Sequence, residues 1–270
     1  MAAPPPTLPA EPFDAVAEVY DDHFTHRLIG RAQRQAVWRE MDRHFRPGQR
    51  ILEINCGTGA DAAHLASRGV RVVACDSSPG MIAVARRNTA AWSDRVDLRT
   101  LPTERISQLA GNGSFDGVLS NFAGLNCVAD LPGVALDLAR LVRPGGKAVL
   151  CAFGRHCLWE MLWFIMQVHP KKAFRRVTDE GVTVNLAPGH SVVVRYPSVR
   201  LLRRIFAPYF RLRNWQGVGI AVPPSYLEHL AVRHARAFRG AERLDGVLGG
   251  FPGIRALADH AVLVLERSET

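Results

Sequence analysis

Short apolar runs separated by longer mixed stretches dominate residues 50–153. The apolar runs predict buried strands at 50–55, 71–76, 95–101, 115–121 and 146–153. The stretches between them predict helices over 60–68, 78–90, 103–110 and 131–142. Regular alternation of strands and helices is typical of a doubly wound α/β fold, in which helices cover both faces of a parallel sheet.

The chain outside this region has other patterns. Apolar residues three and four positions apart predict helical structure over 13–45, and residues 156–168 form a helix-length apolar and aromatic run. Two strand-like stretches, 182–186 and 191–196, flank a Pro-Gly turn and predict a hairpin. The remaining residues predict a helix over 198–208, a strand over 211–217, mostly helical structure over 218–258 and a final strand over 260–266.

These patterns divide the chain into a core and additions to it. The Pro-rich residues 1–12 are expected to be a disordered tail. A core with an N-terminal helical cover spans 13–153, and a lid or cap insertion spans 154–197. The C-terminal part of the core follows over 198–270, with a second helical insertion at about 218–258. We therefore expect one elaborated domain.

Composition is typical of an intracellular globular enzyme. The 270 residues are 47% hydrophobic, enough for a full core, and no apolar run reaches the 18 residues of a membrane span. The amino terminus lacks a basic region followed by an apolar one, so a cytoplasmic location is expected. The five cysteines are odd in number and several lie in predicted strands, which favours free buried thiols. No Cys-x-x-Cys spacing supports a metal site.

The net charge of +9 has two interpretations. Only three residues, Lys147, Lys171 and Lys172, are lysines, so the excess is almost entirely arginine dispersed along the chain. Dispersion favours compositional bias over a designed anion-binding groove. An anionic partner, either nucleic acid or lipid head groups, is the alternative, and no RNA-binding module accompanies the basic clusters. Nucleic acid is therefore not the expected partner, while peripheral membrane contact stays open.

Residues 50–61 carry the clearest chemical signal. A buried strand breaks here into a turn with Gly57 and Gly59 and then opens a helix, which is an arrangement that cradles nucleotides. Asp76 follows at the end of the second strand, about twenty residues after the turn, where a ribose-binding carboxylate belongs. A dinucleotide fingerprint requires a third glycine, but Ala62 stands at that position.

Four motifs in order resemble a different nucleotide-binding family. Residues 52–59 (Leu-Glu-Ile-Asn-Cys-Gly-Thr-Gly) resemble the first motif of the class I S-adenosylmethionine-dependent methyltransferases, with Asn55 in place of its first glycine. Residues 76–86, 115–121 and 141–150, the last with Pro-Gly-Gly, are similar to the segments that follow in that family. Asn tolerates a positive φ better than most residues, so the turn is compatible with Asn55.

The resemblance implies a fold and a cofactor site. The fold is a Rossmann-like doubly wound, seven-stranded mixed sheet with helical and hairpin cap insertions, and the methyl donor is S-adenosylmethionine, with S-adenosylhomocysteine as product. Asp76 would bind the ribose, Met81 would pack on the adenine, and the Tyr20-Asp21 pair would fold over the cofactor. The cofactor-binding residues expected from the resemblance are Tyr20, Arg31, Glu53, Asn55, Cys56, Gly57, Gly59, Asp76, Ser77, Met81, Thr103, Glu104, Asn121 and Phe122.

Substrate choice is expected from the C-terminal half. The aromatic helix over 156–168 predicts a lid over a hydrophobic acceptor, with a core helix or an interfacial helix as alternatives. The residues expected to contact the acceptor are Asn126, Trp159, Trp163 and Tyr196. A reluctant nucleophile would need a base, for which His is the common choice. Among His156, His169, His190 and Tyr196, we rank His190 first because it lies at the hairpin tip.

We therefore predict an enzyme that methylates a small, lipophilic or aromatic acceptor at oxygen, nitrogen or carbon. The pattern is similar to quinone-biosynthesis and natural-product methyltransferases, and the Asn-Pro-Pro-Tyr type motif of base-methylating enzymes is absent after the fourth strand. An RNA or protein methyltransferase is one alternative. A catalytically degenerate cofactor-binding or partner subunit is the other, motivated by Asn55 and by the lack of an obvious base.

Overall fold

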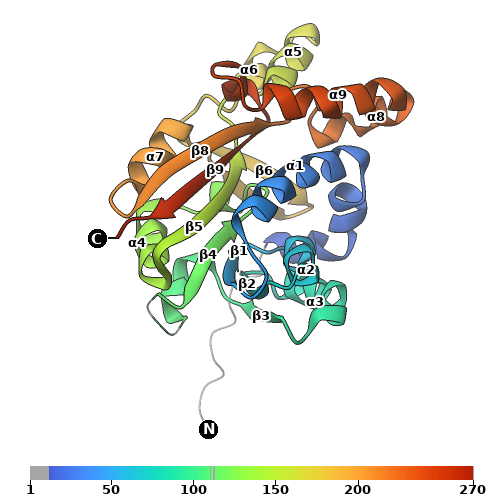
Figure 1. Ribbon diagram of the computed structural model, residues 1–270. Helices are drawn as coiled ribbons and strands as arrows, with labels where there is room; N and C mark the ends of the chain where they lie inside the picture. The colour runs from blue at the N-terminus through green and yellow to red at the C-terminus, as the bar shows by residue number, and fades with distance from the viewer. Residues whose placement is uncertain (1–11, 110, 112, 270) are drawn as a thin grey trace.

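The computed structural model describes residues 12–109, 111 and 113–269. The expected tail over 1–12 lies outside the described residues, apart from Pro12. The chain forms one large sheet with helices on both of its faces, and a cap of helices lies at one end (Figure 1).

Seven strands form the sheet, in the order β3-β2-β1-β4-β5-β9-β8. Strands β1 to β5 run parallel, whereas β9 is antiparallel to both of its neighbours, β5 and β8. The doubly wound, seven-stranded mixed sheet predicted from the resemblance is therefore confirmed. The strand bounds are β1 Arg50–Ile54, β2 Arg71–Asp76, β3 Val96–Thr100, β4 Phe115–Ser120, β5 Val142–Phe153, β8 Phe210–Val218 and β9 His260–Arg267.

Side-chain alternation along the strands builds two separate cores. In β1, Leu52 and Ile54 join the apolar cluster on one face of the sheet, and Ile51 joins the cluster on the other. The first face is covered by α4 (Leu131–Leu141) and α7 (Val199–Phe206). The second is covered by α1 (Leu28–His44), α2 (Ala60–Ser67) and α3 (Pro79–Asn88) (Figure 1). Because both faces are buried, the central strands are apolar at nearly every position.

The N-terminal helical region consists of three pieces. These are the 3-10 helix η1 (Pro12–Val19), the π-helical turn η2 (Asp21–Thr25) and α1. Gly30 allows η2 to fold back onto α1, because a Cβ there would come within 1.9 Å of the Phe24 carbonyl oxygen. The single helical pattern predicted over 13–45 therefore contains a reversal that apolar spacing alone does not encode.

The cap is built from the two insertions. The first contains α5 (Leu158–Met166), α6 (Pro170–Ala173) and the hairpin of β6 (Val182–Ala187) and β7 (His190–Val194). The second contains η6 (Ser225–Leu227), α8 (Glu228–Arg233), α9 (Ala235–Leu248) and η7 (Ile254–Leu257). Trp159 joins the insertions by donating from Nε1 to the Ala221 carbonyl oxygen at 3.2 Å.

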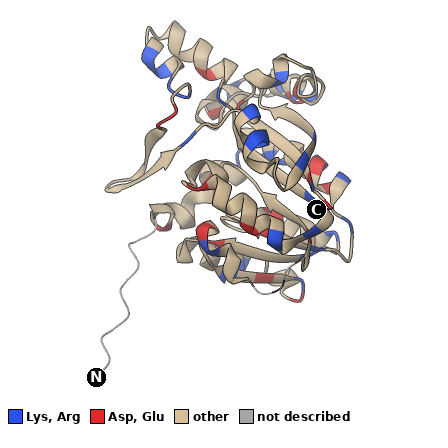
Figure 2. Cartoon of the chain, turned by 90° about the vertical axis from the view of Figure 1, so that its left-hand side faces the viewer, with Lys and Arg blue, Asp and Glu red and all other residues tan. Residues whose placement is uncertain are grey.

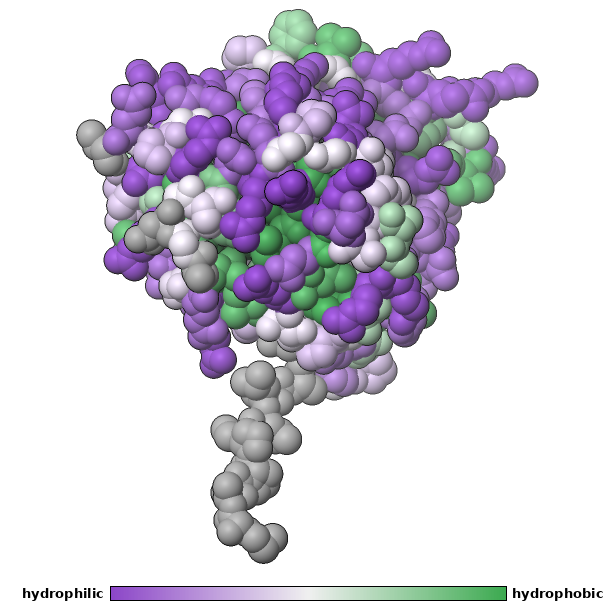
Figure 3. Space-filling view, turned by 60° about the horizontal axis from the view of Figure 1, so that its bottom comes forward, coloured by the Kyte–Doolittle hydropathy of each residue, from purple (hydrophilic) through white to green (hydrophobic). Residues whose placement is uncertain are grey.

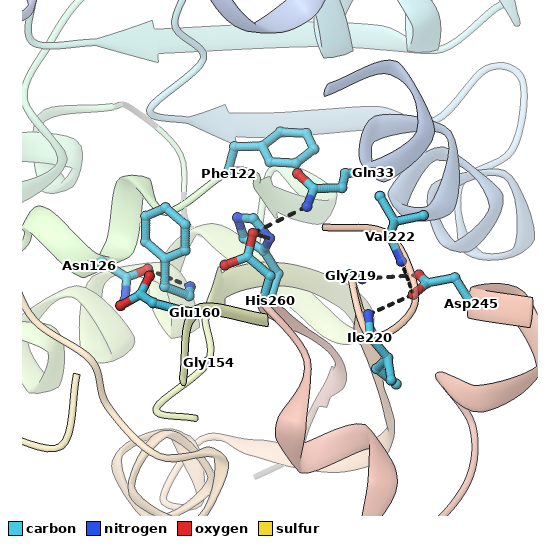
Figure 4. Close-up of polar contacts among 12 residues, drawn as sticks. Gln33, Phe122, Asn126, Gly154, Glu160, Gly219, Ile220, Val222, Asp245 and His260 are labelled. Carbon is cyan, nitrogen blue, oxygen red and sulfur yellow. Dashed lines mark hydrogen bonds and ion pairs between the residues drawn. The ribbon is translucent and has the colours of Figure 1, made fainter. Parts of the chain in front are cut away.

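Asp245 fixes the second insertion to the end of β8. Its buried carboxylate accepts hydrogen bonds from consecutive backbone N–H groups at distances between 2.6 and 3.3 Å (Figure 4). The donors are Gly219, Ile220, Ala221 and Val222. A single carboxylate thus orders the turn that leaves the sheet.

Two predicted elements differ from the observed ones. Residues 103–110 were expected to be a helix, but η4 (Thr103–Gln108) is a short 3-10 helix. Strand β5 begins at Val142, earlier than the predicted 146, because its first residues pair with β4 across a register shift. Gly145, at φ 74°, supplies the left-handed residue that this irregular start needs.

The charges and cysteines are distributed as the sequence indicates. Figure 2 shows Lys and Arg on many elements with Asp and Glu between them, rather than in one groove. The face in Figure 3 is mainly hydrophilic around a central group of hydrophobic side chains.

All five cysteines are free thiols. Within the described ranges, no helix is long and apolar enough to cross a membrane, and no cluster of His, Cys, Asp and Glu is placed to hold a metal ion.

Candidate active site

The turn after β1 has the backbone conformation that the sequence demands. Asn55, Gly57 and Gly59 all have positive φ, at 57°, 54° and 77°. Gly59 is closely packed, since a Cβ there would lie 2.9 Å from the Cβ of Ala85 on α3. A Cβ on Gly57 would instead meet nothing within 4 Å, and Gly57 lines a large cavity. The turn therefore presents open backbone to a ligand at Gly57.

Asp76 connects this turn to the end of β2. Its Oδ2 accepts a hydrogen bond from Gly57 N at 2.8 Å, and its Oδ1 accepts one from Ser78 N at 3.0 Å. Both Asp76 and Ser77 line the cavity beside Gly57. The carboxylate thus holds the turn and also faces the space where a ribose is expected.

Asn55 connects the turn to the opposite wall. Its Nδ2 donates to Thr103 Oγ1 at 2.8 Å, and its Oδ1 accepts from Ser120 Oγ at 3.4 Å. Thr103 and Glu104, expected at the adenine edge, both line the cavity. The residue that departs from the family pattern therefore has its own structural role.

The Tyr20-Asp21 pair closes over the same space. Asp21 accepts hydrogen bonds from Thr58 Oγ1 at 2.7 Å and from Asn88 Nδ2 at 2.9 Å, which fixes η2 to the turn and to α3. Tyr20 lines the cavity next to Met81. Asp21 thus anchors η2 over the cavity, and the ring of Tyr20 forms part of the cavity wall.

One cavity of about 620 Å³ contains these residues and continues under the cap. We call the part next to the turn the donor half. It is lined by Tyr20, Asn55, Gly57, Asp76, Ser77, Met81, Pro102, Thr103 and Glu104. We call the other part the acceptor half. It is lined by Phe153, Val184, Leu186, Val192, Val194, Tyr196, Pro224 and Tyr226.

Period-two patterning explains why the hairpin lines the acceptor half. Val184 and Leu186 of β6 face the cavity, whereas the alternating residues Thr183 and Asn185 are exposed. On β7, Val192 and Val194 also face the cavity. One apolar face of a two-stranded sheet therefore forms a wall of the site.

Asn121 lies behind the donor half rather than on its surface. Its Nδ2 donates to Asp61 Oδ2 at 2.9 Å, and its Oδ1 accepts from Phe122 N at 2.8 Å. Asp61 also accepts from Arg34 Nη1 at 2.7 Å. This network holds Phe122, which has a φ of 44° and lines the cavity. The Arg34 guanidinium lies over the Phe122 ring.

Glu53 is buried beneath the turn. It is 1% exposed and does not line the cavity, and its Oε2 has no hydrogen-bond partner. Burial, together with the nearby charges of Asp61 and Asp76, raises the pKa of Glu53 well above its usual range. The buried position beneath the turn therefore disfavours the charged form of Glu53.

Other expected cofactor residues also lie outside the cavity lining. Cys56 is buried in the turn, and Gly59 contacts α3. Arg31 is exposed on α1, while Arg34, nearly one turn later, is buried against Phe122. Cys56, Gly59 and Arg34 therefore support the residues that line the cavity, whereas Arg31 lies away from it.

Of the four expected acceptor contacts, only Tyr196 lines the cavity. Asn126 is fully buried, and its side chain is engaged by Phe153 N and by the Arg195 carbonyl oxygen. Trp159 donates a hydrogen bond to the second insertion, and the ring centroids of Trp163 and His229 lie 6.4 Å apart. The aromatic helix α5 thus joins the cap pieces together, while the hairpin faces the acceptor half.

His190 also lies away from the cavity lining. Its Nδ1 is 3.0 Å from the Pro188 carbonyl oxygen at the hairpin tip. The geometry therefore gives no support for a base at this position.

His260, which sequence reasoning missed, lines the cavity. Its imidazole is 3% exposed and stacks on Phe153 with ring centroids 4.6 Å apart. Figure 4 shows Phe122 and Gln33 next to it. Asp259 and Arg176, also in the lining, form an ion pair at 2.8 Å. An Asp-His pair beginning a strand was the available signal, but the strand was interpreted only as core.

Comparisons with known proteins identify the family of the chain. Residues 51–146 match a family model described as a methyltransferase domain. A demethylmenaquinone methyltransferase from Symbiobacterium thermophilum is 33% identical over 62% of this chain and 74% of its own length. One from Clavibacter sepedonicus is 38% identical over 52% of this chain, which spans 56% of that relative.

A solved structure supports the fold. The 1,6-didemethyltoxoflavin-N1-methyltransferase of Burkholderia thailandensis, with 1,6-didemethyltoxoflavin and S-adenosylhomocysteine bound, has a TM-score of 0.52 at 19% identity. The match covers 98% of this chain and 94% of that one. The open backbone at Gly57, the carboxylate of Asp76 and the wall at Thr103 suit a nucleoside with a ribose and an adenine. The chain belongs to the class I S-adenosylmethionine-dependent methyltransferases and transfers a methyl group to a small molecule.

Proposed function

We propose that the acceptor is an aromatic, quinone-like molecule of the demethylmenaquinone class. The observation that carries this proposal is the acceptor half of the cavity, which is walled by aliphatic hairpin side chains and by Phe153, Tyr196 and Tyr226. Flat apolar walls favour an aromatic ring over a polar chain. The names of the relatives, which identify demethylmenaquinone as their acceptor, support the same class.

The residues of the donor half hold and orient the donor. Asp76 would accept hydrogen bonds from the ribose hydroxyls, and Asn55 and Thr103 fix the walls on either side. Bound S-adenosylmethionine supplies an electrophilic methyl group. The protein contributes mainly by aligning the two ligands in one enclosed space and by excluding water. For well-aligned reacting groups, alignment of this kind lowers the activation barrier by about 7 kcal/mol or more.

A pair of hairpin variants tests the acceptor assignment. Leu186→Arg places a charged chain in the acceptor half, whereas Asn185→Arg places it on the exposed face of the same strand. With reduced demethylmenaquinone (the hydroquinone) as acceptor and mass spectrometry as the assay, Leu186→Arg should lose at least tenfold in turnover while keeping its affinity for S-adenosylhomocysteine. Asn185→Arg should behave as wild type. Absence of demethylmenaquinone methylation by the wild-type enzyme contradicts the proposal.

We also propose that the cap contacts an anionic membrane surface from the cytoplasmic side. Large hydrophobic side chains are exposed on and around α5, α8 and α9, among them Ile165, Met166, Val168, Val232, Val247 and Phe251. Exposed basic residues accompany them, namely Lys171, Lys172, Arg233, Arg236, Arg239 and Arg243. Apolar groups beside cations suit an interface of anionic lipids, and the free thiols suit a reducing compartment.

Vesicle binding tests the membrane contact. The protein should cosediment with vesicles of phosphatidylcholine and phosphatidylglycerol, and less with phosphatidylcholine alone. Met166→Glu, at a side chain that is 72% exposed, should reduce this binding, whereas Leu201→Glu on α7 should not. Equal binding by both variants and wild type would rule out the cap as the contact surface.

A further inference from the structure

His260 stands where the donor half and the acceptor half meet. It begins β9 and pairs with Phe153, the last residue of β5, so it lies at the sheet edge where the parallel strands end. Its ring meets the ring of Phe122, an expected cofactor contact that also lines the cavity, at a centroid distance of 5.5 Å. On its other side lies Phe153, whose ring is 6.0 Å from that of Tyr196 in the acceptor half.

The imidazole has a nitrogen available to a ligand. Neither ring nitrogen of His260 forms a hydrogen bond within the described part of the chain. Its Nδ1 is buried and lies 3.5 Å from Asp259 Oδ2. A carboxylate next to Nδ1 favours the tautomer with its proton there, which leaves a lone pair on Nε2.

Asp259 is itself held from two directions. Its Oδ1 pairs with Arg176 Nη2 at 2.8 Å, and its Oδ2 accepts from Gln33 Nε2 at 3.2 Å (Figure 4 shows the Gln33 contact). Arg176 is also paired with the buried Glu160 of α5 at 2.8 Å. The carboxylate that faces His260 is therefore rigidly oriented by α1 and by the cap.

We propose that His260 is the catalytic base, which accepts a proton from a hydroxyl group of the aromatic acceptor, and that Asp259 is its positioning residue. This proposal rests on the proposed function, and it narrows the acceptor class to molecules that carry a hydroxyl next to the methylated atom or on it. For a quinone-like acceptor, this means the reduced hydroquinone form, because the quinone itself has no hydroxyl group. No other histidine lines the cavity among the described residues.

The charges around His260 suit this role. Burial lowers the pKa of His260, Asp259 raises it, and Arg176 lowers it again, with a net decrease. The ring is therefore neutral near pH 7 and can accept a proton. Burial raises the pKa of Asp259, but the neighbouring His260 and Arg176 lower it by a larger amount, so the pKa is lowered overall. The carboxylate is therefore ionised and stabilises the imidazolium that forms.

The proton and electron balance is simple. The hydroxyl proton moves to His260 Nε2, and its O–H electron pair makes the acceptor nucleophilic. As the bond between the acceptor and the methyl carbon forms, the S–C bond breaks and its electrons stay on sulfur. When oxygen attacks, this completes the transfer. When the carbon next to the hydroxyl attacks, that carbon then loses its hydrogen as a proton, and the neighbouring oxygen takes up a proton to restore the aromatic hydroxyl. Overall, one proton leaves the acceptor for each methyl group gained, and the imidazolium passes it to water after product release.

Ligand binding tests the base without requiring turnover. In the complex with S-adenosylhomocysteine, 1-naphthol should bind at least tenfold more tightly than 1-methoxynaphthalene, because only the naphthol donates a hydrogen bond to Nε2. His260→Phe preserves the aromatic packing and should abolish this preference, whereas His234→Phe on the exposed surface should retain it. Equal affinity of both probes for the wild type, or an unchanged preference in His260→Phe, overturns the proposal.

Turnover and its pH dependence provide the second test. His260→Phe should lower kcat about 10²- to 10⁴-fold with unchanged affinity for S-adenosylhomocysteine. Asp259→Asn should move the acidic limb of the kcat profile to lower pH, a shift that a purely structural role would not produce. A His260→Phe enzyme with more than a tenth of wild-type kcat overturns the base assignment. A wild type inactive on demethylmenaquinone, but selective for naphthol, refutes the acceptor alone.

Discussion

Replacing Asn55 should separate backbone strain from side-chain bonding in the donor turn. At the φ of 57° found at Asn55, an ordinary L-residue destabilises the folded state by about 1–2 kcal/mol, whereas Asn and Gly tolerate this region. The bond from Asn55 Nδ2 to Thr103 contributes about 0.5–1.5 kcal/mol. Asn55→Ala loses both contributions and should lower the free energy of unfolding by about 2–3 kcal/mol.

Asn55→Gly provides the matched comparison. It removes the same hydrogen bond but restores a residue that accepts positive φ, so its loss should be about 1 kcal/mol smaller than that of Asn55→Ala. Asn185→Ala, at an exposed hairpin position, controls for the loss of an amide. Urea unfolding measures stability, and calorimetry with S-adenosylhomocysteine should show weaker binding for Asn55→Ala. Equal stability of the Ala and Gly variants would refute the strain argument.

Three further changes test other parts of the site and the cap. Asp76→Asn should weaken S-adenosylhomocysteine binding by about 1–3 kcal/mol in calorimetry, and unchanged affinity would show that the ribose lies elsewhere. Asp245→Ala leaves a row of backbone N–H groups without their acceptor and should lower the free energy of unfolding by about 3 kcal/mol; a change below 1 kcal/mol would contradict this role. The pKa of Glu53 is raised in the folded protein, so the free energy of unfolding of the ligand-free protein should fall as pH rises above about 4.5. Glu53→Gln should remove this pH-dependent loss, as measured by denaturation between pH 5 and 8.

The donor half was predictable because its signals are local. A turn that needs positive φ at Asn55, Gly57 and Gly59 is encoded by those residues themselves, and Asp76 follows at a fixed distance along the chain. The parallel sheet was predictable for a similar reason, since buried strands show continuous apolar runs. The expected residues Tyr20, Thr103 and Phe122 were also placed on the cavity.

The acceptor half could not be predicted in the same way, because its walls come from distant segments. An aromatic run predicted α5 as the lid, yet Trp159 bonds to Ala221 of the second insertion and the hairpin faces the cavity instead. His260 lies in a buried strand that pattern reasoning assigns to the core. Only the antiparallel register with β5 brings it to the ligand edge of the sheet. Long-range pairing of this kind leaves no periodic signal.

The central claim is that the turn at Asn55, the carboxylate of Asp76 and the wall at Thr103 form a site for the methyl donor. Calorimetric titration of the wild-type protein with S-adenosylhomocysteine tests it most directly. We predict saturable binding of one ligand per chain, weakened in Asp76→Asn. No heat of binding at millimolar ligand, with the protein folded, would contradict the account.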